Sequence, residues 1–139
     1  MKLVSVNRSK DAPQVLWEMM RTRLQEDRKG YNISHRKMPS WKQHLAFIKS
    51  RRNGHWYMIR KPWCYVGWVY LNDRDEIGLM IFPAQRGFGA GTWALKEIRR
   101  RHKRRRYLAN INPKNKRSIE FFKRAGFKDQ IQITLEKRA

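Results

Sequence analysis

The stretch that decides the fold is a hydrophobic run that stops at a proline and leads into three glycines at alternate positions. It reads Ile81-Phe82-Pro83-Ala84-Gln85-Arg86-Gly87-Phe88-Gly89-Ala90-Gly91-Thr92, and a helical pattern over residues 93–101 follows it. Glycine lets backbone N–H groups approach a ligand without interference from a Cβ atom. The first turn of a helix also offers unpaired N–H donors and the positive end of the helix dipole, so the stretch predicts a phosphate-binding site.

Two common phosphate-binding motifs do not fit this stretch. A nucleoside-triphosphate loop ends in Gly-Lys-Ser/Thr, and no lysine precedes Thr92. The dinucleotide fingerprint is matched loosely by Gly89 and Gly91, but it requires an acidic residue about 20 positions further on. No acidic residue occurs between Glu97 and Glu120. What remains is the pattern Arg/Gln-x-x-Gly-x-Gly/Ala, with an ordinary glycine-rich turn as the alternative.

Length and composition predict one folded domain over residues 1–139. The chain is 40% apolar and has a single cysteine, Cys64, which excludes a disulfide framework and a cysteine metal site. Because no apolar run is long enough to span a membrane and the first residues lack a signal-peptide core, we expect a cytoplasmic protein. The formal net charge of +22 will attract polyanions, whether it is functional or a compositional bias.

The hydrophobic periodicity predicts six strands and four helices. The strands are expected at residues 3–6, 55–60, 64–71, 75–82, 107–111 and 127–135. The helices are expected at residues 11–27, 40–50, 93–101 and 115–125. Ser40 and Gln43 form a capping box, a turn is expected at residues 51–54, and Gly126 stops the last helix. We therefore expect an α/β (α+β) fold with a mixed central sheet, in which strand–helix alternation near the end of the chain implies parallel pairing.

A second motif follows the glycine stretch at a distance of twenty-odd residues. It begins Asn112-Pro113-Lys114-Asn115-Lys116-Arg117-Ser118 and ends Phe121-Phe122-Lys123-Arg124-Ala125-Gly126-Phe127. Together with Arg86 to Gly91, it resembles the GNAT superfamily of acyl-CoA-dependent N-acetyltransferases over roughly residues 41–135. The resemblance implies a single GNAT-like domain whose fourth and fifth strands splay apart and leave a cleft for acetyl-CoA.

The resemblance also implies which residues hold acetyl-CoA, with no metal involved. The pyrophosphate would lie on the loop and helix start, with Arg86 at the mouth: Gly87, Phe88, Gly89, Ala90, Gly91 and Thr92. The pantetheine arm would pair with the backbone of the fourth strand, where one N–H would stabilise the oxyanion: Leu79, Met80, Ile81 and Phe82. Three residues of the second motif would complete the cleft: Asn115, Ser118 and Phe122.

Three residues are candidates for proton transfer. Glu76 lies where many members of the superfamily carry a carboxylate, and a surface ion pair is its alternative role. His44 is a candidate base because a neutral imidazole can accept a proton near pH 7, although its helical spacing also fits a packed core residue. Many members place a tyrosine at the position of Phe122 as the acid for the departing thiolate. Phenylalanine cannot donate a proton, which leaves water or Ser118 to do so.

A block of cations follows the helix of the glycine motif: Arg99, Arg100, Arg101, Lys103, Arg104, Arg105 and Arg106, with His102 among them. Four roles are open for this block: helix capping, binding the 3′-phosphate of CoA, binding a nucleic-acid backbone, or binding an acidic protein. The first functional hypothesis is an acetyl-CoA-dependent N-acetyltransferase that uses direct attack in a ternary complex. Its acceptor would be an amine of a nucleic acid or of a nucleic-acid-associated protein, with a small amine as the alternative and a polyamine disfavoured by like-charge repulsion. The second hypothesis is a non-catalytic DNA- or RNA-binding module on the same scaffold.

Overall fold

The computed structural model describes residues 1–27, 37–50 and 54–139 of the chain, so most of the turn predicted at residues 51–54 lies outside the described residues. The described strands are β1 (Lys2–Ser5), β2 (His55–Lys61), β3 (Cys64–Leu71) and β4 (Ile77–Ile81). The α-helices are α1 (Ala12–Glu26), α2 (Trp41–Ser50), α3 (Ala90–Arg101) and α4 (Lys116–Arg124). Two short 3-10 helices span Val6–Arg8 and Pro83–Gln85. No helix of the described residues is long and apolar enough to cross a membrane.

The sheet is smaller than predicted and is paired differently. Its four strands stand in the order β1-β2-β3-β4, and every neighbouring pair is antiparallel. The predicted fifth strand, residues 107–111, meets β4 at one parallel bridge between Glu76 and Leu108. Two backbone hydrogen bonds of 2.8 Å accompany that bridge, and the strand pairing of the described residues ends there. The expectation of six strands is therefore wrong, and the expected parallel pairing of the fourth and fifth strands is limited to this one bridge.

The last predicted strand, residues 127–135, also does not form in the described structure. Its alternating apolar side chains are 63%, 74% and 89% exposed, in the order Ile131, Ile133 and Leu135. β-branched residues favour extended backbone, but a strand is stabilised by packing against cross-strand neighbours. The residues of this segment predicted an extended backbone, but they could not determine whether another strand would pair with it.

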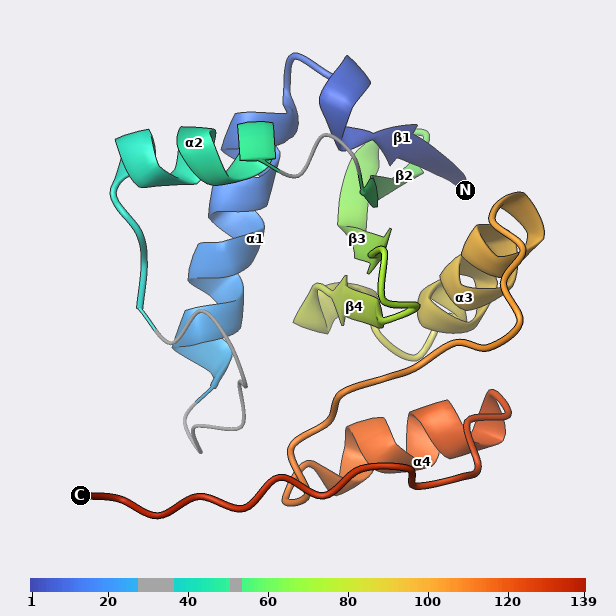
Figure 1. Ribbon diagram of the computed structural model, residues 1–139. Helices are drawn as coiled ribbons and strands as arrows, with labels where there is room; N and C mark the ends of the chain where they lie inside the picture. Colours follow the sequence, from blue (N-terminus) through green and yellow to red (C-terminus); the bar gives the residue numbers. More distant parts are fainter. Residues whose placement is uncertain (28–36, 51–53) are drawn as a thin grey trace.

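Helices cover both faces of the sheet (Figure 1). On one face α1 and α2 bury a cluster that includes Leu16, Met19, Ile48 and Met80. On the other face α3 and α4 bury a second cluster around Leu95 and a phenylalanine of α4. Neighbouring residues of a strand point to opposite faces, and so Met80 of β4 packs toward α1 while Leu79 and Ile81 pack toward α3 and α4.

The local signals for helix ends are confirmed. The backbone N–H of Ser40 donates to Gln43 Oε1 at 2.9 Å, and the N–H of Gln43 donates to Ser40 Oγ at 3.2 Å, which is a reciprocal capping box. Gly126 follows α4 with φ of 101°, where its N–H donates to Lys123 O. These interactions join residues a few positions apart, so the sequence alone specifies them.

Candidate active site

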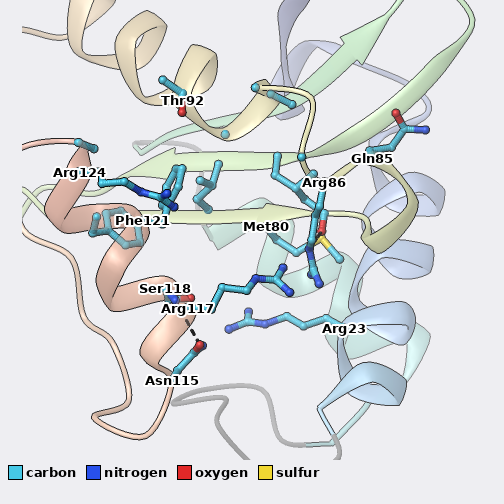
Figure 2. A pocket seen from close by; sticks show the side chains of 18 of the residues that line it. Arg23, Met80, Gln85, Arg86, Thr92, Asn115, Arg117, Ser118, Phe121 and Arg124 are labelled. Atoms are coloured by element: carbon cyan, nitrogen blue, oxygen red, sulfur yellow. Dashed lines mark hydrogen bonds between the residues drawn. The ribbon is translucent and has the colours of Figure 1, made fainter.

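A cleft of about 940 Å³ opens between β4, the glycine-rich loop, α4 and the end of α1. Its walls come from segments far apart in the sequence, as Figure 2 shows. Most residues that the resemblance assigned to the cofactor line this cleft: Leu79, Met80, Ile81, Arg86, Gly87, Gly89, Ala90, Gly91, Thr92, Asn115, Ser118 and Phe122. Phe82 and Phe88 do not line it, and the Phe88 side chain is 72% exposed.

The glycine-rich loop presents backbone donors to the cleft. Gly89 is the N-cap of α3 in the left-handed conformation, with φ of 83°, and its carbonyl accepts the first helical hydrogen bond from Trp93 N at 3.0 Å. The N–H groups of Ala90, Gly91 and Thr92 precede that bond and have no partner within the helix. Because all three residues line the cleft, an anion placed there would meet N–H donors and the positive end of the helix dipole.

The second candidate surface is the edge of β4 that faces away from β3. Ile77 N donates across this outer edge to Leu108 O, whereas Phe82 N donates across the inner edge to Val66 O. Backbone groups alternate along a strand, so the N–H of Leu79 points outward like that of Ile77. Of the four residues expected to present their backbone to the cofactor, Leu79 and Ile81 therefore direct their N–H groups to the outer edge. Met80 and Phe82 direct theirs to β3.

Arg86 holds the loop against α1. Its Nε donates to Ile81 O at 3.0 Å, and its two terminal nitrogens donate to the carboxylate of Glu26, one of them at 2.9 Å to Oε2. A bidentate pair of this kind fixes the position of both side chains. The arginine was predicted to lend charge to a phosphate at the loop mouth. The structure adds a positioning role, because the same guanidinium joins the end of β4 to the end of α1.

The second motif forms the opposite wall of the cleft. Asn115 caps α4, with its Oδ1 accepting from Ser118 N at 3.3 Å. Phe121 lies against the loop, since a Cβ atom built on Gly91 would be 3.1 Å from Phe121 Cζ and 3.3 Å from Leu79 Cδ2. The glycine at position 91 thus sets the spacing between α4 and β4 at this point of the cleft.

Glu76 is held as an anion beside the cleft. Asn72 Nδ2 donates to its Oε1 at 2.8 Å, Asn110 Nδ2 donates to Oε2, and Arg74 Nε lies 3.5 Å from Oε1. The hydrogen bonds from Asn72 and Asn110 are the main causes that lower the pKa of the Glu76 carboxyl. A carboxylate with a lowered pKa is a weak proton acceptor. Glu76 does not line the cleft and instead ties β4 to the segment that carries Asn110.

His44 is fully buried between α1 and α2. Its Nε2 lies 2.8 Å from Pro13 O, and its ring packs edge-on against Trp17 with a centroid distance of 5.3 Å. It lines a separate small cavity and not the cleft of the glycine loop. Of the three residues predicted for proton transfer, Ser118 is therefore the one that the structure brings to the cleft.

Several charged residues of the cleft were not predicted from the sequence. Four arginines line it. Arg86 was predicted, whereas Arg117 and Arg124 of α4 and Arg23 of α1 were not. Glu26 and Asp27, at the end of α1, are its two carboxylates. The basic residue before Gly126 in the second motif was a signal for Arg124. Nothing local in the sequence indicated that α1 would reach the cleft, because that contact depends on how α1 packs on β4.

Part of the basic block is engaged in intramolecular pairs. The Glu97 carboxylate accepts from Arg100 Nη2 at 2.7 Å and from Arg101 Nε at 3.0 Å. Those hydrogen bonds lower the pKa of Glu97 to about 2. Arg104 Nη1 donates to Asp75 Oδ1 at 2.7 Å. Lys103 and Arg105 are exposed and have no carboxylate partner among the described residues.

His102, within the basic block, packs against His55 and Tyr57 of β2. Its ring stacks on His55 with a centroid distance of 3.5 Å, and its Nε2 lies 2.7 Å from the Tyr57 hydroxyl. Burial lowers the pKa of His102, and the neighbouring charges of His55 and Arg104 lower it further. The stack anchors the end of α3 to β2, so this part of the block has a structural role.

Comparison with known proteins agrees with the geometry of the cleft. Residues 16–127 match the model of the acetyltransferase (GNAT) family. No curated protein sequence gives a significant match. Among solved structures, the fold is similar to that of a ribosomal-protein-alanine N-acetyltransferase from Brucella melitensis, with a TM-score of 0.73 and 14% identity over 91% of this chain and 83% of that one.

Two further structures extend the comparison. AAC(6')-Iy, in complex with the bisubstrate analogue CoA-S-monomethyl-acetylneamine, gives a TM-score of 0.71 and 13% identity over 99% of this chain and 96% of that one. RimL, a ribosomal L7/L12 α-N-protein acetyltransferase in complex with coenzyme A, gives a TM-score of 0.70 and 14% identity over 89% of this chain and 77% of that one. At such identities the likeness concerns the fold alone.

The family match spans most of the chain, and the chain therefore belongs to the acetyltransferase (GNAT) family. The expectation drawn from the glycine-rich loop and the second motif is confirmed at this level. As a member of this family, the protein is an N-acetyltransferase. Membership leaves the acceptor amine undefined.

Proposed function

We propose that acetyl-CoA binds with its pyrophosphate at the start of α3 and its pantetheine arm along the outer edge of β4. The observation that carries this placement is the set of three unpaired N–H groups, on Ala90, Gly91 and Thr92, at one end of the cleft. The N–H of Leu79 points outward from this edge of β4, and we assign to it the hydrogen bond to the thioester oxygen as negative charge develops there.

The chemistry is direct attack by a neutral amine on the thioester carbon. The new C–N bond forms, the C–S bond breaks, the amine proton passes to water, and the CoA thiolate is protonated in turn. Phe122 lines the cleft but has no proton to give, so we assign the protonation of the thiolate to Ser118 or water.

Binding of acetyl-CoA tests this function directly. At a concentration one hundred times the dissociation constant, a ligand stabilises the folded state by about 2.7 kcal/mol, which raises Tm by roughly 5 °C or more for a chain of this size. ATP at the same concentration is the control, because a chain of charge +22 attracts any polyanion. We expect the Tm shift with acetyl-CoA to exceed that with ATP, and no shift at millimolar acetyl-CoA would contradict the proposal.

The finer hypothesis is that the acceptor amine belongs to a nucleic acid or to a protein bound to one. Its support is the net charge of +22 and the exposed pair Lys103 and Arg105, which no described carboxylate neutralises. Arg100, Arg101 and Arg104 contribute less free charge than the sequence indicates, because Glu97 and Asp75 already pair with them.

The salt dependence of DNA binding tests whether the basic block is a specific DNA-binding surface or only one part of a high net charge. Each lost phosphate contact lowers the slope of log K against log salt concentration by about 0.9. We expect the double variant Lys103→Gln/Arg105→Gln to reduce that slope by about 1 to 2 in a fluorescence-anisotropy titration with duplex DNA. The matched control is Lys2→Gln/Arg8→Gln, which removes the same charge from another exposed site. Equal effects of the two doubles, or binding insensitive to salt, would contradict a dedicated surface at the block.

A further inference from the structure

Two aromatic side chains project into solvent at one end of the sheet. Trp63 lies in the two-residue turn, Pro62 and Trp63, that joins β2 to β3, and it is 83% exposed. Phe88 belongs to the glycine-rich loop and is 72% exposed. Neither residue lines the cleft. An aromatic ring stabilises a fold mainly through the apolar area that it buries, so the fold gains little from either ring.

Lys61 links the two rings. Its Nζ lies 5.6 Å from the centre of the Phe88 ring and donates to Gln85 Oε1 at 3.2 Å, so the end of β2 contacts the glycine-rich loop. Trp63 is two residues beyond Lys61, and Pro62 between them has a fixed φ. Because the turn is short and contains proline, Trp63 loses little conformational freedom when a ligand contacts it. We call Lys61, Trp63 and Phe88 the hairpin patch.

The surroundings of the hairpin patch are positively charged. Residues 28–72 and 77–96 contain no Asp or Glu, so neither the hairpin nor the loop has an acidic residue of its own. Lys61 and the preceding Arg60 have no carboxylate partner within the described parts of the chain. The Glu26 carboxylate, which does reach the loop, is already paired with an arginine there. The charge at the hairpin patch therefore favours an anionic partner.

Exposed rings beside unneutralised cations suit single-stranded nucleic acid. Its bases are free to stack on aromatic side chains, and its phosphates bind lysine and arginine close to the stacked bases. In a duplex the bases are enclosed in the stack, so exposed rings contribute little to duplex binding. A phospholipid surface would also satisfy the charge. However, two rings offer a small apolar area, and stable attachment to a membrane requires a larger one.

We propose that the hairpin patch binds single-stranded nucleic acid, with bases stacked on Trp63 and Phe88 and a phosphate bound by Lys61. The patch lies outside the cleft, and the proposal does not depend on the use of the cleft for acetyl-CoA. It also differs from the basic block, whose exposed cations suit a single strand and a duplex alike. The rings of the hairpin patch supply the contribution that is specific to a single strand.

Anisotropy titrations of the full chain test the proposal, with a labelled single strand and with the same strand annealed to its complement. Trp63→Ala should raise the Kd for the single strand by about tenfold, the usual effect of removing one stacking ring, and leave the Kd for the duplex nearly unchanged. Phe88→Ala should act in the same way, and Trp63→Phe should keep most of the affinity because it retains an aromatic face. Unchanged single-strand affinity in both alanine variants, or an equal loss for the duplex, would overturn the proposal.

Leu135→Ala is the matched control for exposed apolar surface. Leu135 is 89% exposed and lies outside the hairpin patch, so its loss should change neither Kd. An effect of Leu135→Ala as large as that of Trp63→Ala would contradict stacking at the patch. Since all these positions are exposed, we expect each variant to keep the Tm of the wild type, and a raised Kd then reports binding and not folding.

Lys61→Gln tests the phosphate contact. One contact contributes about 0.7 to the slope of log K against log salt concentration for a single strand, and we expect the variant to lose about that amount. Lys10→Gln is the control, because Lys10 is exposed and lies outside the hairpin patch. A loss of the same size in Lys10→Gln would contradict the assignment of a phosphate to Lys61.

Two other ligands could occupy the exposed rings, and each gives a distinct result. If Trp63→Ala and Phe88→Ala weaken acetyl-CoA binding as much as strand binding, the rings bind the adenine of the donor and the proposal is overturned. If they weaken sedimentation with phosphatidylserine vesicles and leave the single-strand Kd unchanged, the rings bind lipid, which also overturns it. A raised single-strand Kd with unchanged acetyl-CoA affinity supports the proposal.

Discussion

Gly89→Glu should abolish acetyl-CoA binding, with a loss of about a hundredfold or more in kcat/KM. Gly89 has φ of 83°, a conformation that costs a residue with a Cβ atom about 1–2 kcal/mol. The new carboxylate would also lie at the start of α3, where it would compete with the pyrophosphate for the N–H donors and repel it. Losing one or two charge-assisted hydrogen bonds of about 1.5–3 kcal/mol each accounts for the size of the effect. Isothermal calorimetry with acetyl-CoA measures the loss of binding, and the rate of thiol release measures kcat/KM.

Gly126→Glu is the matched control for this experiment. Gly126 also has a positive φ, 101°, and a Cβ atom there would meet nothing within 4 Å. The control therefore introduces the same backbone strain and the same charge at a residue that does not line the cleft. We expect a similar fall in Tm for both variants and loss of acetyl-CoA binding for Gly89→Glu alone. Retained binding in Gly89→Glu would contradict the placement of the pyrophosphate at the start of α3.

Gly67→Ala should be the most destabilising small substitution in the sheet. Gly67 lies in β3 opposite Ile81, and a Cβ atom there would lie 2.0 Å from Met80 O and 3.0 Å from Ile81 Cα. These are backbone atoms, so β4 would have to move away from β3. We expect a loss of roughly 4 kcal/mol, which is a large part of the stability of an ordinary domain. Urea unfolding followed by circular dichroism measures the loss.

Gly78→Ala is the contrasting variant. Its Cβ atom would also meet a neighbour at 2.0 Å, but that neighbour is the ring of Tyr70, a half-buried side chain. A ring can rotate away from the new methyl group at a cost of about 1–3 kcal/mol, whereas a paired strand cannot. Equal unfolding midpoints for Gly67→Ala and Gly78→Ala would contradict this account of the β3–β4 contact. Because β4 also carries the edge that faces the cleft, Gly67→Ala should weaken acetyl-CoA binding as well.

The two glycines show what a sequence pattern can predict about a sheet. A glycine inside a strand marks a bulge or a close approach of a neighbour, and at Gly78 the structure shows the close approach of Tyr70. The register shift occurs instead between Ile59 and Arg60, where β2 pairs with β3. A glycine in a strand indicates that a neighbouring group leaves no room for a Cβ atom. Which neighbour fills the space depends on the partner strand, which is remote in sequence.

The candidate site divides in the same way. The cofactor loop and Asn115 were predicted because their roles follow from local backbone conformation and from a motif. The basic block was also visible in the sequence, but its pairing was not, since Asp75 and Glu97 neutralise part of it only once the chain is folded. His44 could be a base or a core residue by its spacing. Its burial between α1 and α2 comes from helix packing.

The sequence by itself determined the glycine-rich turn into α3, the ends of the helices and membership of the acetyltransferase (GNAT) family. Each of these depends on residues within about one turn of each other, or on a motif whose spacing is fixed. Only the tertiary structure decided the number of strands and the place of α1 at the cleft, where Arg23 faces α4 (Figure 2). The physical reason is that strand pairing and helix packing join segments that are distant in the chain, and a segment's own residues do not specify which neighbour it will meet.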